Sequence, residues 1–362
     1  MTATPMRTSP VELGIVEGYF GTPWSWPDRT ATMRALAPVG YRFFIYAPKA
    51  ETRLRRQWRD PLPEDALDEL ARFAAACRAA GTRFGLGLSP YGAHLGFDER
   101  EKRSLTDKLA QLDEIGLDDL AILFDDMDAG AQDLASTQAD IVHFAAARTS
   151  ATRVLTCPSY YSDDPVLDRV FGARPPGYLA ELGRLLDPSV GVFWTGEEVC
   201  ARAQSAAALE RVAERLRRKP VLWDNYPVND GPRMSAHLHL RSFTGRSPEV
   251  AGAVAAHAIN PALQPTLTRI PALTLADSYE AGPRYSYGAA LRAAAASVAG
   301  EALGAMLVED LMLLQDTGLD RLGDKRDELR DRYAAVDHPA AREVTAWLDG
   351  AYAVSGEVLR TQ

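Results

Sequence analysis

Two adjacent carboxylates, Asp125 and Asp126, follow a short apolar run and are the clearest candidates for chemistry in this sequence. Charge repulsion and partial desolvation tend to leave one member of such a pair ionised and the other protonated near neutral pH. Glycoside hydrolysis needs this division, because a proton donor must meet the leaving oxygen while an anion stabilises positive charge. Adjacent residues reach the same side of a sugar, so the nucleophile could be the substrate's own 2-acetamido oxygen.

Two other interpretations of the pair stay open at this point. An isolated Asp-Asp pair is most often a helix N-cap or part of a solvated turn. Together with Asp128, Asp125 and Asp126 could instead chelate Mg²⁺ in a metal-dependent barrel enzyme. No phosphate-cradling loop accompanies the three residues, which ranks the metal site lower.

Eight short apolar runs alternate with amphipathic stretches and must position these residues. Most of the runs are continuously hydrophobic, as expected for strands buried on both faces of a parallel sheet. Eight such strands over about 250 residues predict an α/β fold, a TIM (β/α)8 barrel, with a doubly wound sheet as the structural alternative. The runs are Leu13–Val16, Phe43–Tyr46, Arg83–Leu88, Leu120–Phe124, Arg153–Cys157, Val190–Trp194, Pro220–Trp223 and Val250–Ala256.

Polar and aromatic residues recur where these predicted strands end, which is where barrel enzymes place their active sites. Aromatic faces beside carboxylates and amides suit a sugar ring, which has apolar C–H faces and a rim of hydroxyls. The segments are 17–24, 46–49, 89–91, 124–128, 157–161, 194–197 and 223–230, followed by His257 and Asn260.

The chain changes character near residue 280, after which helical patterns follow one another without a strand. We therefore expect a flexible N-terminus at 1–11, a catalytic barrel at 12–280 and an all-helical C-terminal extension at 281–362. The helical tail could cap the barrel or build a homodimer.

Composition narrows the class of protein. The 362 residues are 46% hydrophobic and 25% charged, which is typical of a globular protein, and the formal net charge of −9 argues against nucleic acid or an anionic membrane as partner. Three widely spaced cysteines form neither a zinc pattern nor a disulfide framework. No secretory signal or transmembrane segment is visible, so we expect a soluble cytoplasmic protein with no metal or organic cofactor.

Taken together, the strand ends resemble those of glycoside hydrolase family 84, the β-N-acetylglucosaminidases that include the O-GlcNAcases. The matching segments fall in family order across residues 13–265, and WDNYPVND and LFDDM are specific. They are VEGYFGTPWSW (16–26), FIYAPKA (44–50), ILFDDMD (122–128), LTCPSYY (155–161), VFWTGEEV (192–199), VLWDNYPVND (221–230) and LHLRSFTGR (238–246).

The resemblance implies a retaining exo-β-N-acetylglucosaminidase that removes terminal N-acetylglucosamine by substrate-assisted catalysis. Asp125 would polarise the acetamido group, whose oxygen attacks the anomeric carbon to form an oxazoline, and Asp126 would be the general acid/base. The implied substrate-binding residues surround them. Tyr161 would contact the acetamido group, Trp223 would wall its pocket, Asn225 would hold the acid/base or the acetamide, and Gly18, Lys49, Asp230 and Asn260 would contact the sugar hydroxyls.

Two features depart from the family pattern or leave it ambiguous. The family usually has Gly-Phe-Tyr after the first strand, whereas this chain has Gly18-Tyr19-Phe20. Tyr160 precedes Tyr161, so either tyrosine could line the pocket. A non-catalytic N-acetylglucosamine-binding barrel is the alternative function of another class.

Overall fold

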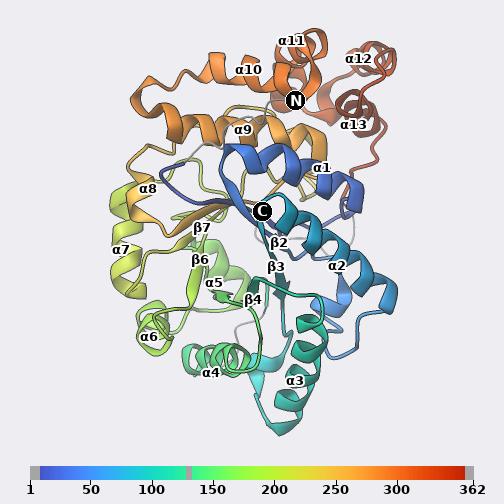
Figure 1. Ribbon diagram of the computed structural model, residues 1–362. Coiled ribbons are helices and arrows are strands. Elements are labelled where there is room, and N and C mark those ends of the chain that lie inside the picture. The colour runs from blue at the N-terminus through green and yellow to red at the C-terminus, as the bar shows by residue number, and fades with distance from the viewer. Residues whose placement is uncertain (1–8, 128–132, 355–362) are drawn as a thin grey trace.

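The centre of the molecule is a closed barrel of eight parallel strands, in which each strand pairs with the next and β8 pairs with β1 (Figure 1). The computed structural model describes residues 9–127 and 133–354, so most of the expected flexible N-terminus lies outside the described residues. The predicted TIM (β/α)8 barrel is confirmed. Its strands are β1 Leu13–Glu17, β2 Tyr41–Tyr46, β3 Arg83–Leu88, β4 Asp119–Leu123, β5 Arg153–Cys157, β6 Gly191–Trp194, β7 Val221–Asp224 and β8 Ala256–Ile259.

Helices alternate with the strands and bury one face against the barrel. In α7, for example, Leu209, Val212 and Leu216 are buried at helical spacing, and the Ser205 hydroxyl caps the first turn. The helices are α1 Trp26–Leu36, α2 Glu64–Ala79, α3 Glu99–Asp113, α4 Leu134–Ala146, α5 Pro165–Phe171, α6 Tyr178–Leu185, α7 Ala206–Leu216, α8 Val250–Ala253 and α9 Pro265–Ala281.

The prediction of the eighth strand at Val250–Ala256 is wrong over most of its length. Residues 250–253 form the short helix α8, which begins where the amides of Val250 and Ala251 donate to the carbonyls of Ser247 and Pro248. Small apolar residues fit a helical turn as well as a strand, so the run alone did not distinguish them. Strand β8 starts six residues later than predicted, at Ala256.

Four further helices form the predicted C-terminal extension, and they lie together over α9 (Figure 1). They are α10 Tyr287–Ala299, α11 Glu301–Glu309, α12 Lys325–Ala334 and α13 Pro339–Leu348. Leu267 and Ile270 of α9 belong to the same apolar cluster as Leu291 of α10 and Trp347 of α13. The extension is thus packed onto the barrel, while the domain boundary at residue 280 and a homodimer through this tail stay predictions.

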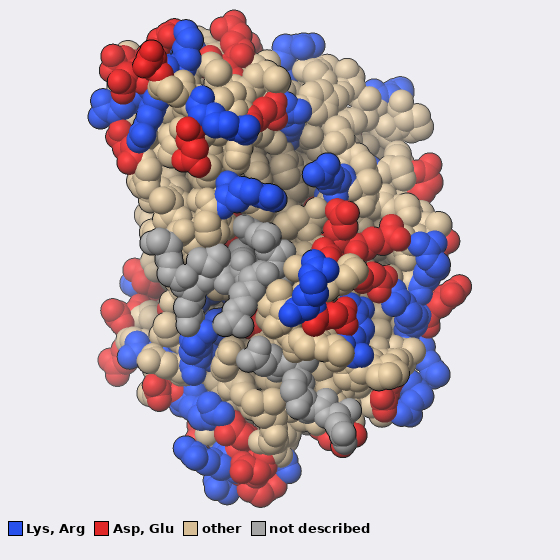
Figure 2. Space-filling model, turned by 180° about the vertical axis from the view of Figure 1, so that it is seen from behind, with Lys and Arg blue, Asp and Glu red and all other residues tan. Residues whose placement is uncertain are grey.

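The surface carries both signs of charge. On the face in Figure 2, acidic and basic side chains are interspersed and crowd most densely at the end of the molecule that carries α12. Among the described residues, no helix is long and apolar enough to cross a membrane.

One buried carboxylate joins the tail to the barrel. Glu343 of α13 accepts hydrogen bonds from the backbone amides of Thr266 (2.8 Å) and Leu267 (2.9 Å), in the first turn of α9. A carboxylate at a helix N-terminus satisfies amides that have no partner within the helix. Burial nevertheless raises the pKa of Glu343 from 4.5 to about 7, because its charged form is poorly solvated.

This junction predicts a stability that falls as pH rises. Because the folded-state pKa is raised, the favourable contribution of Glu343 is complete below about pH 4.5 and is lost as pH increases through about 7. Relative to Glu343→Gln, which does not titrate, the wild-type chain should lose up to about 3 kcal/mol of unfolding free energy over that window. Denaturant unfolding of both proteins from pH 4.5 to 8 measures the difference, and a pH-independent difference would contradict this assignment.

Candidate active site

One pocket at the carboxyl ends of the strands brings together all nine site residues expected from the sequence. Its volume is about 470 Å³, counted with the space open to solvent at its mouth. The structure thereby brings the nine expected site residues together, and their individual roles stay predictions. The lining residues are Gly18, Lys49, Asp125, Asp126, Tyr161, Trp223, Asn225, Asp230 and Asn260, together with Cys157, Thr195, Val199, Cys200 and Val228.

The Asp125–Asp126 pair shares a buried cation. The Lys49 ammonium contacts Asp125 Oδ2 and lies 3.4 Å from Asp126 Oδ2. Burial lowers the pKa of Lys49, but the two carboxylates outweigh that effect and hold the pKa above its ordinary value. Lys49 therefore stays charged and opposes the repulsion between the two aspartates. The sequence indicated Lys49 as a sugar contact, and this pairing with both carboxylates was not anticipated.

Asp125 keeps one oxygen unused. Its residue is only 5% exposed, and Oδ1 is buried without a hydrogen-bond partner among the described residues. A buried carboxylate oxygen without a partner is costly, so such an atom at a pocket wall is a strong acceptor for a donor supplied by a ligand. The geometry therefore suits an incoming N–H group.

Asp126 is held from two sides in an uncommon backbone conformation. Its φ is +58°, in the left-handed region that residues with a Cβ rarely adopt. The Tyr161 hydroxyl donates to Asp126 Oδ1 over 3.0 Å, and the Arg55 guanidinium donates to the Asp126 carbonyl over 3.2 Å. Burial and the Asp126 charge raise the pKa of Tyr161 well above 10, so this hydroxyl stays a donor.

A chain of hydrogen bonds links four strand ends around the pocket. The Gly18 amide donates to Asn260 Oδ1 (3.3 Å), and Asn260 Nδ2 donates to Asn225 Oδ1 (3.0 Å). Asn225 Nδ2 in turn donates to the Val199 carbonyl (2.8 Å). Each amide side chain is thus fixed in orientation before any ligand arrives. Beside this chain, the buried Asp230 accepts from the Phe20 amide over 2.7 Å.

Trp223 forms an apolar wall of the pocket and depends on a glycine opposite. The ring is 4% exposed and meets Phe193 edge-on, with ring centroids 5.2 Å apart. A Cβ placed on Gly18 would lie 2.2 Å from Trp223 Cζ2, well inside van der Waals contact. Only glycine at position 18 lets the first loop approach this ring.

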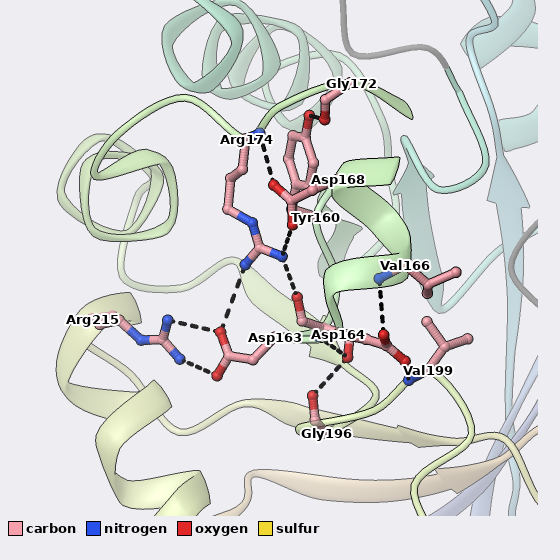
Figure 3. A network of polar contacts seen from close by, with 11 residues as sticks. Tyr160, Asp163, Asp164, Val166, Asp168, Gly172, Arg174, Gly196, Val199 and Arg215 are labelled. Carbon is pink, nitrogen blue, oxygen red and sulfur yellow. Dashed lines mark hydrogen bonds and ion pairs between the residues drawn. The ribbon is translucent and has the colours of Figure 1, made fainter. Parts of the chain in front are cut away.

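The structure distinguishes the two adjacent tyrosines. Tyr161 lines the pocket, whereas the Tyr160 hydroxyl points away and donates to the Gly172 carbonyl over 2.6 Å. Figure 3 shows Tyr160 beside Arg174, in a network outside the pocket. In that network Asp163 pairs with Arg215 (2.7 Å), and Asp164 accepts from the amides of Val166 (2.9 Å) and Val199 (3.2 Å).

The reversed order Tyr19-Phe20 turns the first hydroxyl away from the pocket. Tyr19 is fully buried, donates to Glu17 Oε1 (2.9 Å) and accepts from the Trp24 amide (2.9 Å). Glu17 also pairs with Arg29 over 2.7 Å, so its role is structural. The Tyr19 hydroxyl thus stabilises the loop after β1, and the Phe20 side chain carries no hydroxyl.

Several functional positions were not singled out from the sequence. Cys157, Thr195, Val199 and Val228 lie within the recognised segments, and Cys200 directly follows one, so their place on strand ends was the available signal. For the metal alternative, Asp128 lies outside the described residues. Among the residues that are described, no group of three or more His, Cys, Asp or Glu could hold a metal ion.

A closed parallel barrel with paired carboxylates and an aromatic, amide-lined pocket at its carboxyl end is the arrangement of a glycoside hydrolase. The β-N-acetylglucosaminidase family profile matches residues 13–312. The chain belongs to that family, which confirms the resemblance to glycoside hydrolase family 84.

Individual relatives agree with this membership. The protein O-GlcNAcases of Mus musculus and Rattus norvegicus are each 30% identical over 249 residues, which are 66% of this chain. The match spans only about a quarter (26%) of the length of those relatives. An Asp-to-Asn variant of an O-GlcNAc hydrolase from Thermobaculum terrenum superposes with a TM-score of 0.77 at 26% identity, covering 94% of this chain and 80% of that one.

The contact between Gly18 and Trp223 predicts a specific steric defect. Gly18→Ala should displace the ring, destabilise the fold by about 1–3 kcal/mol and reduce sugar affinity, because the overpacked core must shift. Gly252→Ala is the matched control, since a Cβ there meets nothing within 4 Å. Thermal unfolding and binding of N-acetylglucosamine measure both effects, and a Gly18→Ala protein that behaves like Gly252→Ala would refute the packing argument.

Proposed function

We propose that this chain is a retaining exo-β-N-acetylglucosaminidase that hydrolyses terminal β-linked N-acetylglucosamine with the help of the substrate's own acetamido group. The observation that carries the proposal is the buried Asp125 Oδ1, which has no hydrogen-bond partner among the described residues, beside a second carboxylate that lines the same pocket. Family membership and the O-GlcNAcase relatives support the same reaction.

In the first step, Asp125 Oδ1 accepts the acetamido N–H and so makes the acetamido carbonyl oxygen more nucleophilic. That oxygen attacks the anomeric carbon as the glycosidic C–O bond breaks, and Asp126 gives its proton to the departing oxygen. The product on the sugar is a bicyclic, protonated oxazoline whose N–H stays hydrogen-bonded to the Asp125 carboxylate, and the aglycone leaves as an alcohol. Lys49 stabilises the negative charge of Asp125 throughout, because its ammonium contacts the other oxygen of that carboxylate.

In the second step, Asp126 works in the opposite direction. Its carboxylate, held by the Tyr161 hydroxyl, takes a proton from a water that attacks the anomeric carbon. The oxazoline opens to regenerate the acetamido group, and two displacements at one carbon give net retention. No protein atom becomes covalently attached to the sugar.

The remaining pocket residues position the ring. Trp223 offers an apolar wall for the acetamido methyl, and Asn225 and Asn260 are fixed by the hydrogen-bond chain that ends on Gly18. We assign the contacts to the sugar hydroxyls to Gly18, Lys49, Asp230 and Asn260. A larger crevice, of about 1880 Å³ when the space open to solvent is counted, adjoins the pocket through Val199, Cys200 and Asn225 and has room for part of an aglycone.

Removing the general acid/base should selectively slow the hydrolysis of substrates with poor leaving groups. Asp126→Asn should lower kcat/KM about 10²–10⁴-fold for an alkyl or weakly activated aryl β-N-acetylglucosaminide, but far less for a dinitrophenyl substrate that needs no protonation. Steady-state rates on the two substrates measure this. Asp163→Asn, which changes a neighbouring carboxylate outside the pocket, is the control, and equal losses on both substrates would reject the role of Asp126.

Removing the acetamide-polarising residue should harm every substrate. Asp125→Ala should reduce kcat about 10²–10³-fold even on the dinitrophenyl glycoside, because nucleophilic attack itself is slowed. The same variant should lose affinity for a thiazoline inhibitor that mimics the oxazoline. N-acetylglucosamine binding without any turnover by the wild-type chain would instead establish a non-catalytic sugar-binding barrel.

A further inference from the structure

Arg55 is a buried cation beside the active site that has no role in the reaction as described above. It is 6% exposed and follows the 3-10 turn Thr52–Leu54, in the loop after β2. It does not line the pocket, and none of the sequence motifs includes it.

The backbone around Arg55 is firmly anchored. The Leu54 carbonyl accepts from the Ser89 amide (2.8 Å), and the Arg55 carbonyl accepts from the Trp58 amide (3.3 Å). Trp58 is fully buried, and its indole N–H donates to the Tyr91 carbonyl over 3.2 Å. The loops after β2 and β3 thus hold the Arg55 Cα in place, so its side chain starts from a fixed point.

The guanidinium reaches Asp126 between two aromatic rings. Its centre lies 5.8 Å from the centroid of Phe20 and 5.4 Å from that of Tyr91, within the range of cation–π attraction. From there it donates to the Asp126 carbonyl over 3.2 Å. The Arg55 backbone is therefore anchored, and its guanidinium is held by two aromatic rings and one hydrogen bond.

The backbone of Asp126 needs such a support. A residue with a Cβ persists at a φ of +58° only when its surroundings hold it there. Rotation out of this conformation would swing the carboxylate away from the Tyr161 hydroxyl, 3.0 Å away, and from the leaving oxygen.

We propose that Arg55 is a positioning residue for the general acid/base: by holding the Asp126 carbonyl, it keeps the Asp126 carboxylate aimed at the glycosidic oxygen. This assignment rests on the proposed function, since it presupposes that Asp126 transfers the proton. Arg55 acts through Asp126 and does not touch the sugar. Its removal should therefore slow protonation while leaving the acetamido pocket intact.

The experiment compares Arg55→Gln with Arg56→Gln on a series of aryl β-N-acetylglucosaminides of graded leaving-group pKa. Arg56 is the matched control, because its guanidinium lies over the same Tyr91 ring, 5.2 Å from the centroid, but is exposed. Arg55→Gln should lose about 10²-fold in kcat/KM on the poorest leaving group and less than about 5-fold on the best, as expected for a displaced acid. In Arg56→Gln, kcat/KM should depend on the leaving-group pKa as it does in the wild type.

Two further measurements separate positioning from general damage. The inhibition constant of the thiazoline inhibitor should stay within about 3-fold of the wild-type value in Arg55→Gln, since the acetamido pocket is unchanged. In the Asp126→Asn protein, adding Arg55→Gln should lower kcat/KM by less than about 3-fold. The effects of two residues that act through one group are not additive. Arg55→Lys, which keeps the charge, should show an intermediate loss and replaces Arg55→Gln in every comparison if that variant does not fold.

The outcomes separate the two claims. Wild-type protein that hydrolyses none of the series would overturn the proposed function, and this assignment with it. Hydrolysis by the wild type with a uniform loss across leaving groups in Arg55→Gln, or with a full additional loss in the Asp126→Asn background, would overturn the role of Arg55 alone.

Discussion

The site depends on one ammonium group placed between two buried carboxylates. Lys49 contacts Asp125 and lies 3.4 Å from Asp126, so one positive charge balances part of two negative ones in a poorly solvated pocket. Without it, two adjacent aspartates at the end of an apolar strand would repel each other. Its contacts with both residues reduce that repulsion. The roles that we propose for the two residues thus depend on their shared contact with Lys49.

The fold also fixes other residues that line the pocket. Hydrogen bonds between side chains and backbone tie the ends of β1, β6, β7 and β8 together around the pocket, through Gly18, Asn260, Asn225 and Val199. The helical tail braces the same side of the barrel, since Glu343 binds the first turn of α9 immediately after β8. Preorganisation of this kind lowers the cost of arranging polar groups when the reaction occurs.

The sequence predicted the barrel and the pocket lining better than it predicted the contacts within the pocket. Continuous apolar runs mark parallel strands, whose ends converge. The family resemblance implied nine site residues at or near these ends, and all nine line one pocket. Strand β8 was misplaced because the small apolar residues 250–253 fit a helical turn as well as a strand. The pairing of Lys49 and the contact of Arg55 depend on where side chains meet across loops, which spacing does not specify.

In the proposed mechanism, the acetamido oxygen of the substrate is the nucleophile. Progressive fluorination of the N-acetyl methyl in an aryl β-N-acetylglucosaminide weakens that oxygen while leaving the rest of the substrate nearly unchanged. We expect kcat to fall steeply from the acetyl through the mono- and difluoroacetyl to the trifluoroacetyl substrate. Each added fluorine should lower kcat by about 10-fold or more, because the weakened oxygen attacks in the transition state. A kcat independent of fluorination would show that a protein group or water attacks the anomeric carbon, and it would contradict the account.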